Sequence, residues 1–242
     1  TDPLGNVTQY AYTSAGQLAS VTDARGLVTQ FAYDSFGNLT SQTASDGGVT
    51  SNTYDSLNRL TATKDPLGRI TTYTYDTSDQ QTSVTNPAGE VSTSVYSSGQ
   101  LIAVVDALGN RTSYTYNRFG SRATEQNALG YVTTYNYDSS NNLTSVQQPL
   151  GQISTNVYNS ASQLIATVDP LGNRTSYTYD ALNRRTEVRD ANNHVSTTVY
   201  DNCSNVSASV DALGNRTSYT YDAMNRRTVV IDALGNRTTS QY

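Results

Sequence analysis

The chain has 242 residues, a formal net charge of −5, 14% charged residues, 19 Tyr and one Cys. The negative charge argues against nucleic-acid binding, which needs a basic face. No apolar run approaches the roughly 18 to 20 residues of a membrane-spanning helix, so membrane insertion is not expected. The single Cys203 excludes an internal disulfide framework and a cysteine-built metal site. Val, Thr and Tyr outnumber Lys and Glu, which predicts a folded, β-rich chain with a thin aliphatic core.

A four-residue turn motif recurs along the whole chain, beginning with Asp-Pro-Leu-Gly at 2–5. The spacing is 21 residues, except for one spacing of 20 between 86 and 106. Asp at the first position can cap a type I turn, and the fourth position suits a left-handed residue. Twelve starts fit this register: 2, 23, 44, 65, 86, 106, 127, 148, 169, 190, 211 and 232. The fourth position is Asn193 in one copy and glycine in the others: Gly5, Gly26, Gly47, Gly68, Gly89, Gly109, Gly130, Gly151, Gly172, Gly214 and Gly235.

Each copy continues with a predicted β-strand of about seven residues, such as 173–179. A tyrosine follows the start by ten residues in every copy: Tyr12, Tyr33, Tyr54, Tyr75, Tyr96, Tyr116, Tyr137, Tyr158, Tyr179, Tyr200, Tyr221 and Tyr242. Seven copies hold a second aromatic residue two positions earlier, as in Tyr177. A spacing of two is the strand period, so both rings project from one face. We expect a row of tyrosines along one face, with rings of successive copies packed against one another.

A second, weaker turn follows each first strand, as in Asp180-Ala-Leu-Asn183, and leads into a second strand such as 184–189. Twelve first strands and eleven second strands give about 23 strands. Short hairpin loops make sequence neighbours adjacent and antiparallel. The predicted fold is therefore all-β, a long antiparallel meander wound as a β-spiral or solenoid-like shell or fibre. Residues 1–242 form a single array of twelve repeats. The face taken by the Leu and Val of the second strands, such as Leu164 and Val168, stays open.

A longer period overlies the repeat. The copies starting at 65, 86 and 106 resemble, in order, those starting at 127, 148 and 169. One interpretation is duplication of a three-repeat block. The other is that three repeats make one turn of a spiral, so that equivalent positions stack.

No constellation of residues points to catalysis, a cofactor or a metal. His194 is the only histidine and lies just after a turn, where it has no fixed partner for a triad or metal site. Cys203 takes a turn position that is apolar elsewhere, as a small substitute or as a reactive thiol. The turn aspartates are interpreted as caps, with calcium binding as the alternative. Arginines such as Arg184–Arg185 and Arg226–Arg227 are expected to pair with a turn aspartate of an adjacent repeat.

The recurring Tyr-x-Tyr-Asp-x-x-Gly/Asn-x-Leu/Arg pattern resembles the YD repeats of the Rhs family over the whole chain. That family includes bacterial Rhs and wall-associated proteins, the B and C components of Tc toxins, and teneurins. The resemblance implies a secreted or cell-surface protein whose repeats wind a β-sheet spiral. In the toxin members the spiral closes into a hollow shell around a toxic domain.

These observations lead to a primary hypothesis of a non-enzymatic structural protein, part of an extracellular shell or a surface fibre. Tyr242 ends the sequence inside the pattern, with no capping element after it. The expected partners are therefore copies of the chain joined end to end, or the rest of a longer Rhs-like chain. The alternative is a glycan-binding adhesin module, in which exposed tyrosines stack on sugars. An enzyme is the third hypothesis, and no partnered base or nucleophile supports it.

Overall fold

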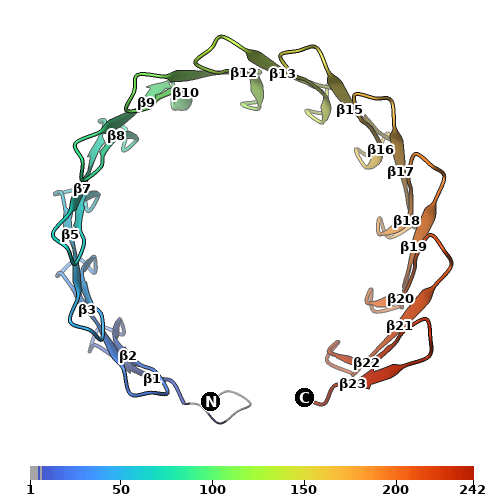
Figure 1. The fold of residues 1–242 in the computed structure, drawn as a ribbon, viewed down its shortest axis with the longest axis horizontal. Coiled ribbons are helices and arrows are strands. Elements are labelled where there is room, and N and C mark those ends of the chain that lie inside the picture. Colours follow the sequence, from blue (N-terminus) through green and yellow to red (C-terminus); the bar gives the residue numbers. More distant parts are fainter. Residues whose placement is uncertain (1–4, 6) are drawn as a thin grey trace. The chain divides into compact units, whose positions relative to one another are not determined.

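The computed structural model describes residue 5 and residues 7–242. Asp2, Pro3 and Leu4 of the first predicted repeat lie outside the described residues. The described chain is all β, with 23 strands in one antiparallel sheet (Figure 1). The predicted fold class, a long antiparallel meander of about 23 short strands, is confirmed. No helix long and apolar enough to cross a membrane occurs in the described part of the chain.

The odd-numbered strands are the predicted first strands, and eleven of the twelve contain the repeat tyrosine. Their bounds are β1 (Gln9–Tyr12), β3 (Val28–Tyr33), β5 (Val49–Tyr54), β7 (Ile70–Tyr75), β9 (Val91–Ser97), β11 (Arg111–Tyr116), β13 (Val132–Tyr137), β15 (Ile153–Tyr158), β17 (Arg174–Tyr179), β19 (Val195–Tyr200), β21 (Arg216–Tyr221) and β23 (Arg237–Thr239). The exception is β23, which we expected to run to Tyr242. It stops at Thr239, which lies opposite Val229 of β22.

The even-numbered strands are the predicted second strands. Their bounds are β2 (Leu18–Thr22), β4 (Leu39–Thr43), β6 (Leu60–Lys64), β8 (Gln81–Thr85), β10 (Gln100–Val105), β12 (Arg122–Gln126), β14 (Leu143–Gln147), β16 (Leu164–Val168), β18 (Arg185–Arg189), β20 (Val206–Val210) and β22 (Arg227–Ile231). Most strands are one residue shorter than predicted, because the residue after each left-handed turn position belongs to the turn.

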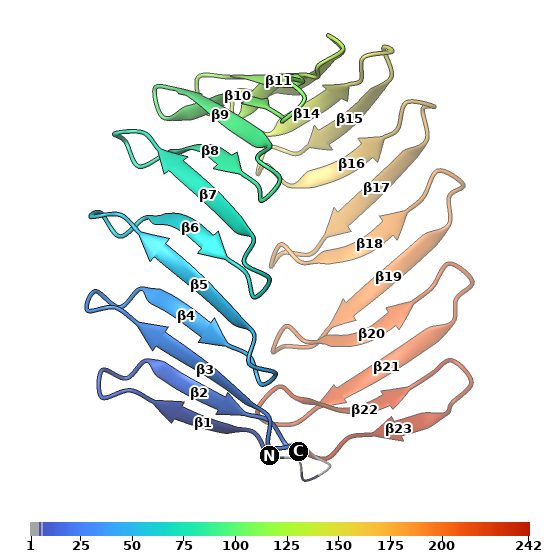
Figure 2. The same cartoon turned by 60° about the vertical axis from the view of Figure 1, so that its left-hand side comes forward.

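The chain divides into two compact units, residues 1–114 with 127–129, and residues 115–126 with 130–242. Within each unit every strand pairs with its neighbours in sequence, as in β2 with β3 and β16 with β17. Figure 2 shows that the hairpin turns then line the two sides of each strip of strands. We call these sides the first-turn edge, formed by the Asp-Pro-Leu-Gly type turns, and the second-turn edge.

Both kinds of turn have the same backbone. In the first turn at 169–173, the Gly172 N–H donates to the Asp169 carbonyl at 3.0 Å, and the Asp169 N–H donates to the Asn173 carbonyl at 3.0 Å. The second turn at 180–184 makes the same two bonds between Asn183 and Asp180 and between Asp180 and Arg184, both at 3.0 Å. The fourth residue has positive φ, 85° at Gly172 and 64° at Asn183. This is a type I turn followed by a left-handed residue.

The one 20-residue spacing is absorbed in a shorter second turn. Strand β9 runs to Ser97 and β10 begins at Gln100, so that only Ser98 and Gly99 connect them. Their φ values are 47° and 81°. Two consecutive left-handed residues form the two-residue hairpin turn that fits the twist of antiparallel strands. The deletion therefore changes the turn type, and Leu101 still lies opposite Tyr96.

A β-bulge follows the second turn in β2, β4, β6, β8, β10, β14, β16, β18, β20 and β22. In β17 and β18, Tyr179 lies opposite Arg185 and Thr178 lies opposite Glu187, which leaves Thr186 as the extra residue. The Thr186 hydroxyl donates to the Thr178 carbonyl at 3.3 Å. In a regular strand two residues that are two positions apart lie on the same face of the sheet. Across the bulge they lie on opposite faces, as Arg185 and Glu187 do.

The bulge answers which face the aliphatic residues of the second strands take. Leu164 lies opposite Tyr158, before the bulge, and therefore shares the tyrosine face. Val146 lies opposite Tyr135 and shares it as well, whereas Val168 lies opposite Thr155 on the other face. The tyrosine face thus gains both Leu and Val from one second strand, although the two residues are three positions apart, as in Leu143 and Val146.

The sheet has very little core. The accessible surface is 15649 Å², against about 10,500 Å² expected for a compact 26.1 kDa protein. Among the described residues only Ala103, Ala166 and Ala208 are buried. Each of these alanines lies between a valine and a serine of the neighbouring strands, on the face opposite the tyrosines. Neighbouring strands, rather than a second layer, therefore provide most of the burial.

Candidate functional site: contacts between repeats

The strands of successive repeats separate toward the second-turn edge. Strands β2 and β3 are paired from Thr22–Val28 to Ser20–Gln30, and the pairing stops there. The same three-pair ladder joins β16 to β17 and β20 to β21. Backbone groups near the second-turn edge therefore need partners from side chains.

The repeat tyrosines supply one set of these partners. The Tyr33 hydroxyl donates to the carbonyl of Leu18, the residue opposite the tyrosine of the preceding repeat, at 3.0 Å. Nine described tyrosines make this bond, at 2.8–3.1 Å: Tyr33, Tyr54, Tyr75, Tyr137, Tyr158, Tyr179, Tyr200, Tyr221 and Tyr242. Each hydroxyl thus replaces a missing ladder donor and ties one repeat to the one before it. Burial, with the neighbouring Tyr135, raises the pKa of the Tyr137 hydroxyl.

This contact differs from the ring-on-ring packing that we expected between repeats. Tyrosines of successive repeats are separated by two strand spacings, about 9.5 Å along the sheet. Aromatic pairs interact at ring-centroid distances of about 4.5–7 Å. The rings therefore form columns, as in Tyr158 and Tyr179, but the hydroxyl makes the connection.

A second set of contacts runs directly from turn to turn along the second-turn edge. In each case the fifth residue of one second turn donates to a residue with positive φ in the next second turn, as Asn205 Nδ2 does to Asn225 Oδ1 at 2.9 Å. Eight such bonds of 2.8–3.2 Å, which we call the second-turn bridges, start from Gln17, Asn38, Arg59, Gln80, Asn142, Gln163, Arg184 and Asn205. We did not predict them. The signal was present, because these eight side chains are all Asn, Gln or Arg, which are polar and able to donate.

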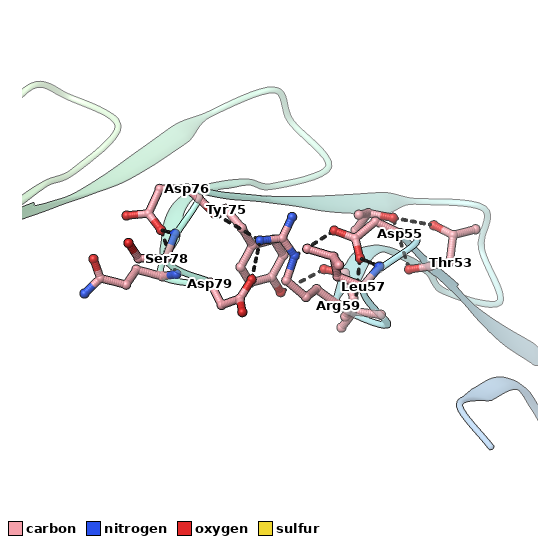
Figure 3. Close-up of polar contacts among 11 residues, drawn as sticks. Thr53, Asp55, Leu57, Arg59, Tyr75, Asp76, Ser78 and Asp79 are labelled. Carbon is pink, nitrogen blue, oxygen red and sulfur yellow. Dashed lines mark hydrogen bonds and ion pairs between the residues drawn. The ribbon is translucent and has the colours of Figure 1, made fainter. Parts of the chain in front are cut away.

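Arg59 is a bridge residue that contacts two turns and a ring (Figure 3). Its Nε lies 2.7 Å from Asp55 Oδ2 in its own turn, and its Nη1 lies 2.8 Å from Asp79 Oδ1 in the next turn. The same Nη1 donates to the Asp76 carbonyl at 3.0 Å. The guanidinium also lies over the Tyr75 ring, 4.8 Å from its centroid. The hydrogen bond to Asp55 raises the pKa of Arg59, so one cation joins two turns and a repeat tyrosine.

The other arginines correct our expectation about ion pairs. Arg184 and Arg226 each pair at 2.7 Å with the aspartate of their own turn, Asp180 and Asp222, and not with that of an adjacent repeat. The turn places its fifth residue directly beside the first, so the nearest carboxylate is local. Arg184 does reach the next turn, through the Asp201 carbonyl and Ser204 Oγ.

The two remaining arginines of these pairs contact rings. Arg185 lies over the Tyr177 ring and Arg227 over the Tyr219 ring, both at 5.5 Å. Each arginine stands opposite the repeat tyrosine of its own hairpin, Tyr179 or Tyr221. They therefore cover the tyrosine face where other repeats have leucine.

The turn aspartates act as caps. Asp169 Oδ1 accepts the N–H groups of Leu171 and Asn173 at 2.9 and 2.8 Å, and Oδ2 accepts from Asn173 Nδ2 at 2.8 Å. The Asn173 side-chain bond, followed by its backbone N–H, lowers the pKa of Asp169. In the second turn, the backbone N–H of Arg184, followed by its side chain, lowers the pKa of Asp180. Both carboxylates are used within their turns, and the described residues contain no group of acids, His or Cys able to hold a metal.

The structure gives every predicted turn glycine the same conformation, with φ between 81° and 87°. Open space surrounds most of them, so the left-handed backbone, rather than crowding, favours glycine there. In the second turns, by contrast, the fourth residue is often Asn, Ser or Asp with φ of 58–68°. Its side chain accepts a second-turn bridge in Asn58, Asp79, Ser162, Asn183, Ser204 and Asn225.

Open grooves lie between successive turns. At the first-turn edge, a groove of about 240 Å³ lies between the turns at Gly172 and Asn193, and one of about 350 Å³ lies between those at Gly26 and Gly47. At the second-turn edge, a groove of about 470 Å³ is lined by Phe119, Tyr135 and Tyr137, among others. The bridge position beside it is Ser121, whose Oγ accepts a hydrogen bond from Asn141 Nδ2 of the next second turn at 2.8 Å.

Comparison with known proteins agrees with this repeating geometry. The RHS Repeat family model matches residues 1–26, 12–49, 54–91, 96–126, 120–153, 158–195 and 200–239. The chain belongs to the RHS repeat family. No curated protein matches the RHS repeats of this chain.

Solved structures similar to these RHS repeats are Tc toxin proteins. The crystal structure of TcdB2-TccC3-TEV has a TM-score of 0.73 at 17% identity, covering 94% of this chain and 14% of that one. The Tc holotoxin pore of Photorhabdus luminescens, with a substitution in TccC3, gives 0.74 at 17% identity and the same coverage. The crystal structure of TcdB2-TccC3-Cdc42 gives 0.56, covering 93% and 15%. The RHS repeats described here thus span about a seventh of the chains they match, and the likeness is one of fold.

The two singular residues of the RHS repeats take ordinary turn positions. The backbone N–H of His194 caps onto Asp190, and its Nδ1 lies 2.9 Å from Asp190 Oδ2. The contact with the His194 N–H lowers the pKa of Asp190. Cys203 is exposed and its N–H donates to Asp201 Oδ1 at 2.8 Å. Neither residue is brought toward the other.

Proposed function

We propose that the chain is a non-enzymatic wall segment of a longer Rhs-like polypeptide, in which the twelve repeats act as one array of a secreted, toxin-encapsulating shell. The observation that carries this proposal is that the repeat-specific side chains are used between repeats. The tyrosine hydroxyls and the second-turn bridges hold one hairpin to the next within each unit. Such contacts suit a wall built of successive hairpins.

The family and the neighbours support the same role. RHS Repeat matches extend over nearly the whole chain, and the similar folds come from chains about seven times longer. The repeat tyrosines and turn glycines are then the residues that the function needs. The tyrosines link hairpins, and the glycines keep every first turn in one geometry.

Electron microscopy of the full polypeptide that carries these repeats tests the proposal. A closed particle with a thin β wall and an interior space is the expected result. A surface fibre would retain the structural role and remove the encapsulating one. Compact particles without a wall or a filament would overturn both.

A glycan-binding role is a second candidate, favoured by the groove that Phe119, Tyr135 and Tyr137 line. Aromatic rings beside polar groups such as Asn117 and Asp138 are suited to sugars. A glycan array with the intact chain and with Tyr135→Ala distinguishes the two roles. Binding that the substitution removes supports a glycan site, and an array without binding excludes it.

A further inference from the structure

The first-turn edge carries a row of exposed leucines. In the unit that contains residues 130–242, the third residue of the first turn is Leu150, Leu171, Leu213 or Leu234, and these side chains are 80–88% exposed. Successive turns at this edge are two strand spacings apart, about 9.5 Å. In a chain with so little aliphatic content, such a row is a solvent-exposed apolar strip.

The turn itself does not require leucine. Asn192 takes the same position in the turn between Asp190 and Asn193, with the same backbone bonds of 3.0 and 3.1 Å. Its N–H caps onto Asp190 Oδ1 at 2.9 Å, as the Leu171 N–H does onto Asp169 Oδ1. The leucines therefore contribute nothing to the turn that asparagine does not, and contacts within this chain do not explain them.

We propose that this leucine row is an interaction surface for the same edge of a second copy of the chain. Pairing about a two-fold axis sets the row against itself, so the spacing of the two rows matches at every turn. A partner without the repeat would meet one or two leucines and miss the others. This inference goes beyond the wall function proposed above, which stands whether or not the edge pairs.

The edge is also suited to self-association by shape and charge. Between the turns of this edge lie grooves, such as the one of about 240 Å³ between the turns at Gly172 and Asn193, which is several times the roughly 30 Å³ share of a water molecule. A leucine of one copy enters such a gap in the other. From residue 148 onward the edge has four turn aspartates and four arginines beside them, as in Asp169 with Arg174 and Asp190 with Arg189. Two copies therefore meet without net charge repulsion.

Sedimentation velocity over about a hundredfold range of concentration tests the proposal with the whole chain. The wild-type chain should form dimers as its concentration rises. The fourfold variant Leu150→Asn, Leu171→Asn, Leu213→Asn and Leu234→Asn should lower the association constant at least about tenfold. Its circular dichroism should not change, because Asn192 already occupies this position.

The second-turn edge supplies the matched control, the variant Phe119→Asn, Leu182→Asn and Met224→Asn. These residues are 52–72% exposed and occupy the same position of the other turn. This variant should associate as the wild type does. A wild-type chain that stays monomeric throughout, or a fourfold variant that associates as strongly as the wild type, overturns the proposal. So does an association that Thr238→Pro in β23 abolishes and the leucine variant does not, since that result shows end-to-end stacking.

Discussion

The two turn edges share one backbone geometry and differ in the residues at its fourth and fifth positions. At the first-turn edge the fourth residue is glycine in eleven copies, and among residues 148–239 no first-turn side chain bonds a neighbouring first turn. At the second-turn edge the fourth residue is often Asn or Ser, which accepts a bond from the preceding turn. The comparison shows that L-residues held in the left-handed conformation at the second-turn edge also connect repeats through their side chains, whereas Asn193 at the first-turn edge has the same conformation without such a bond to any described residue.

The largest expected effect tests whether the two backbones are equivalent. Gly172→Val at the first-turn edge and Gly120→Val at the second-turn edge should each lower the free energy of unfolding by about 2 kcal/mol or more, because a β-branched residue is forced to positive φ. Urea denaturation followed by circular dichroism measures the losses.

Gly172→Asn is the control for that substitution. It should cost clearly less, since Asn193 adopts a φ of 65° at the same position of another first turn. Clearly unequal losses for the two valine variants would show that the turns are not equivalent after all.

The second-turn bridges predict a difference between two glutamines at the same turn position. Gln163 accepts from Asn159 Nδ2 at 2.7 Å and donates to Asn183 at 3.0 Å, whereas the Gln152 side chain has no hydrogen-bond partner among the described residues. Gln163→Ala should therefore lower the free energy of unfolding by about 1–2 kcal/mol, and Gln152→Ala by less than about 0.5 kcal/mol. Similar losses in urea melts of the two variants would remove the distinction between the edges.

The tyrosine hydroxyls predict a smaller effect. Tyr179→Phe deletes the 2.8 Å bond to the Leu164 carbonyl and should cost about 0.5–1.5 kcal/mol of unfolding free energy. Tyr96→Phe is the control, because no described residue bonds the Tyr96 hydroxyl, and it should be close to neutral. Hydrogen exchange of β16 and β17 locates the loss. Equal protection in both variants would mean that the rings alone hold the repeats.

The smallest effect concerns pH. Hydrogen bonds lower the pKa of Asp169 and of Asp180 in the folded chain, so these groups add stability above their unfolded pKa of about 3.9. That stability is lost as the pH falls below about 4 and through the lowered folded values. Acid unfolding followed by tyrosine fluorescence should start in this window.

Asp180→Asn and Asp169→Asn compare the two edges in the same window. Each should leave the turn intact, because Asn86 caps the N–H groups of Ala88 and Glu90 in the same way at 3.0 Å. Only the change at Asp180 removes an ion pair, so it alone should reduce the salt dependence of the urea midpoint at pH 7. Salt dependence that falls equally in both variants would contradict the comparison.

Sequence reasoning reached the strands and turns because each has a local cause. The Tyr-x-Tyr spacing predicts the first strands, and the Asp-to-Gly motif predicts the turns with their left-handed fourth residue. It did not reach the bulge at Thr186, because no residue type marks a bulge; the bulge changes which residues of its own strand, β18, lie on each face.

The contacts between repeats were missed for a related reason. Residues that touch across the second-turn edge, such as Asn205 and Asn225, are 20 positions apart, one short of the repeat length. A search for identical positions one repeat apart does not pair them. The ion-pair partner of each arginine was also not predictable, because it depends on how close the turn brings its fifth residue to its first, as in Arg184 and Asp180.

The two-residue turn at Ser98–Gly99 has a consequence for how such a chain can change. One residue is missing from that repeat, yet the neighbouring strands keep their partners on both sides. Alignment is thus held by the extended segments, while the tips of the loops are free to vary in length. Short peptides, tags or recognition sequences grafted at this tip should be carried on the surface with the repeats around them undisturbed.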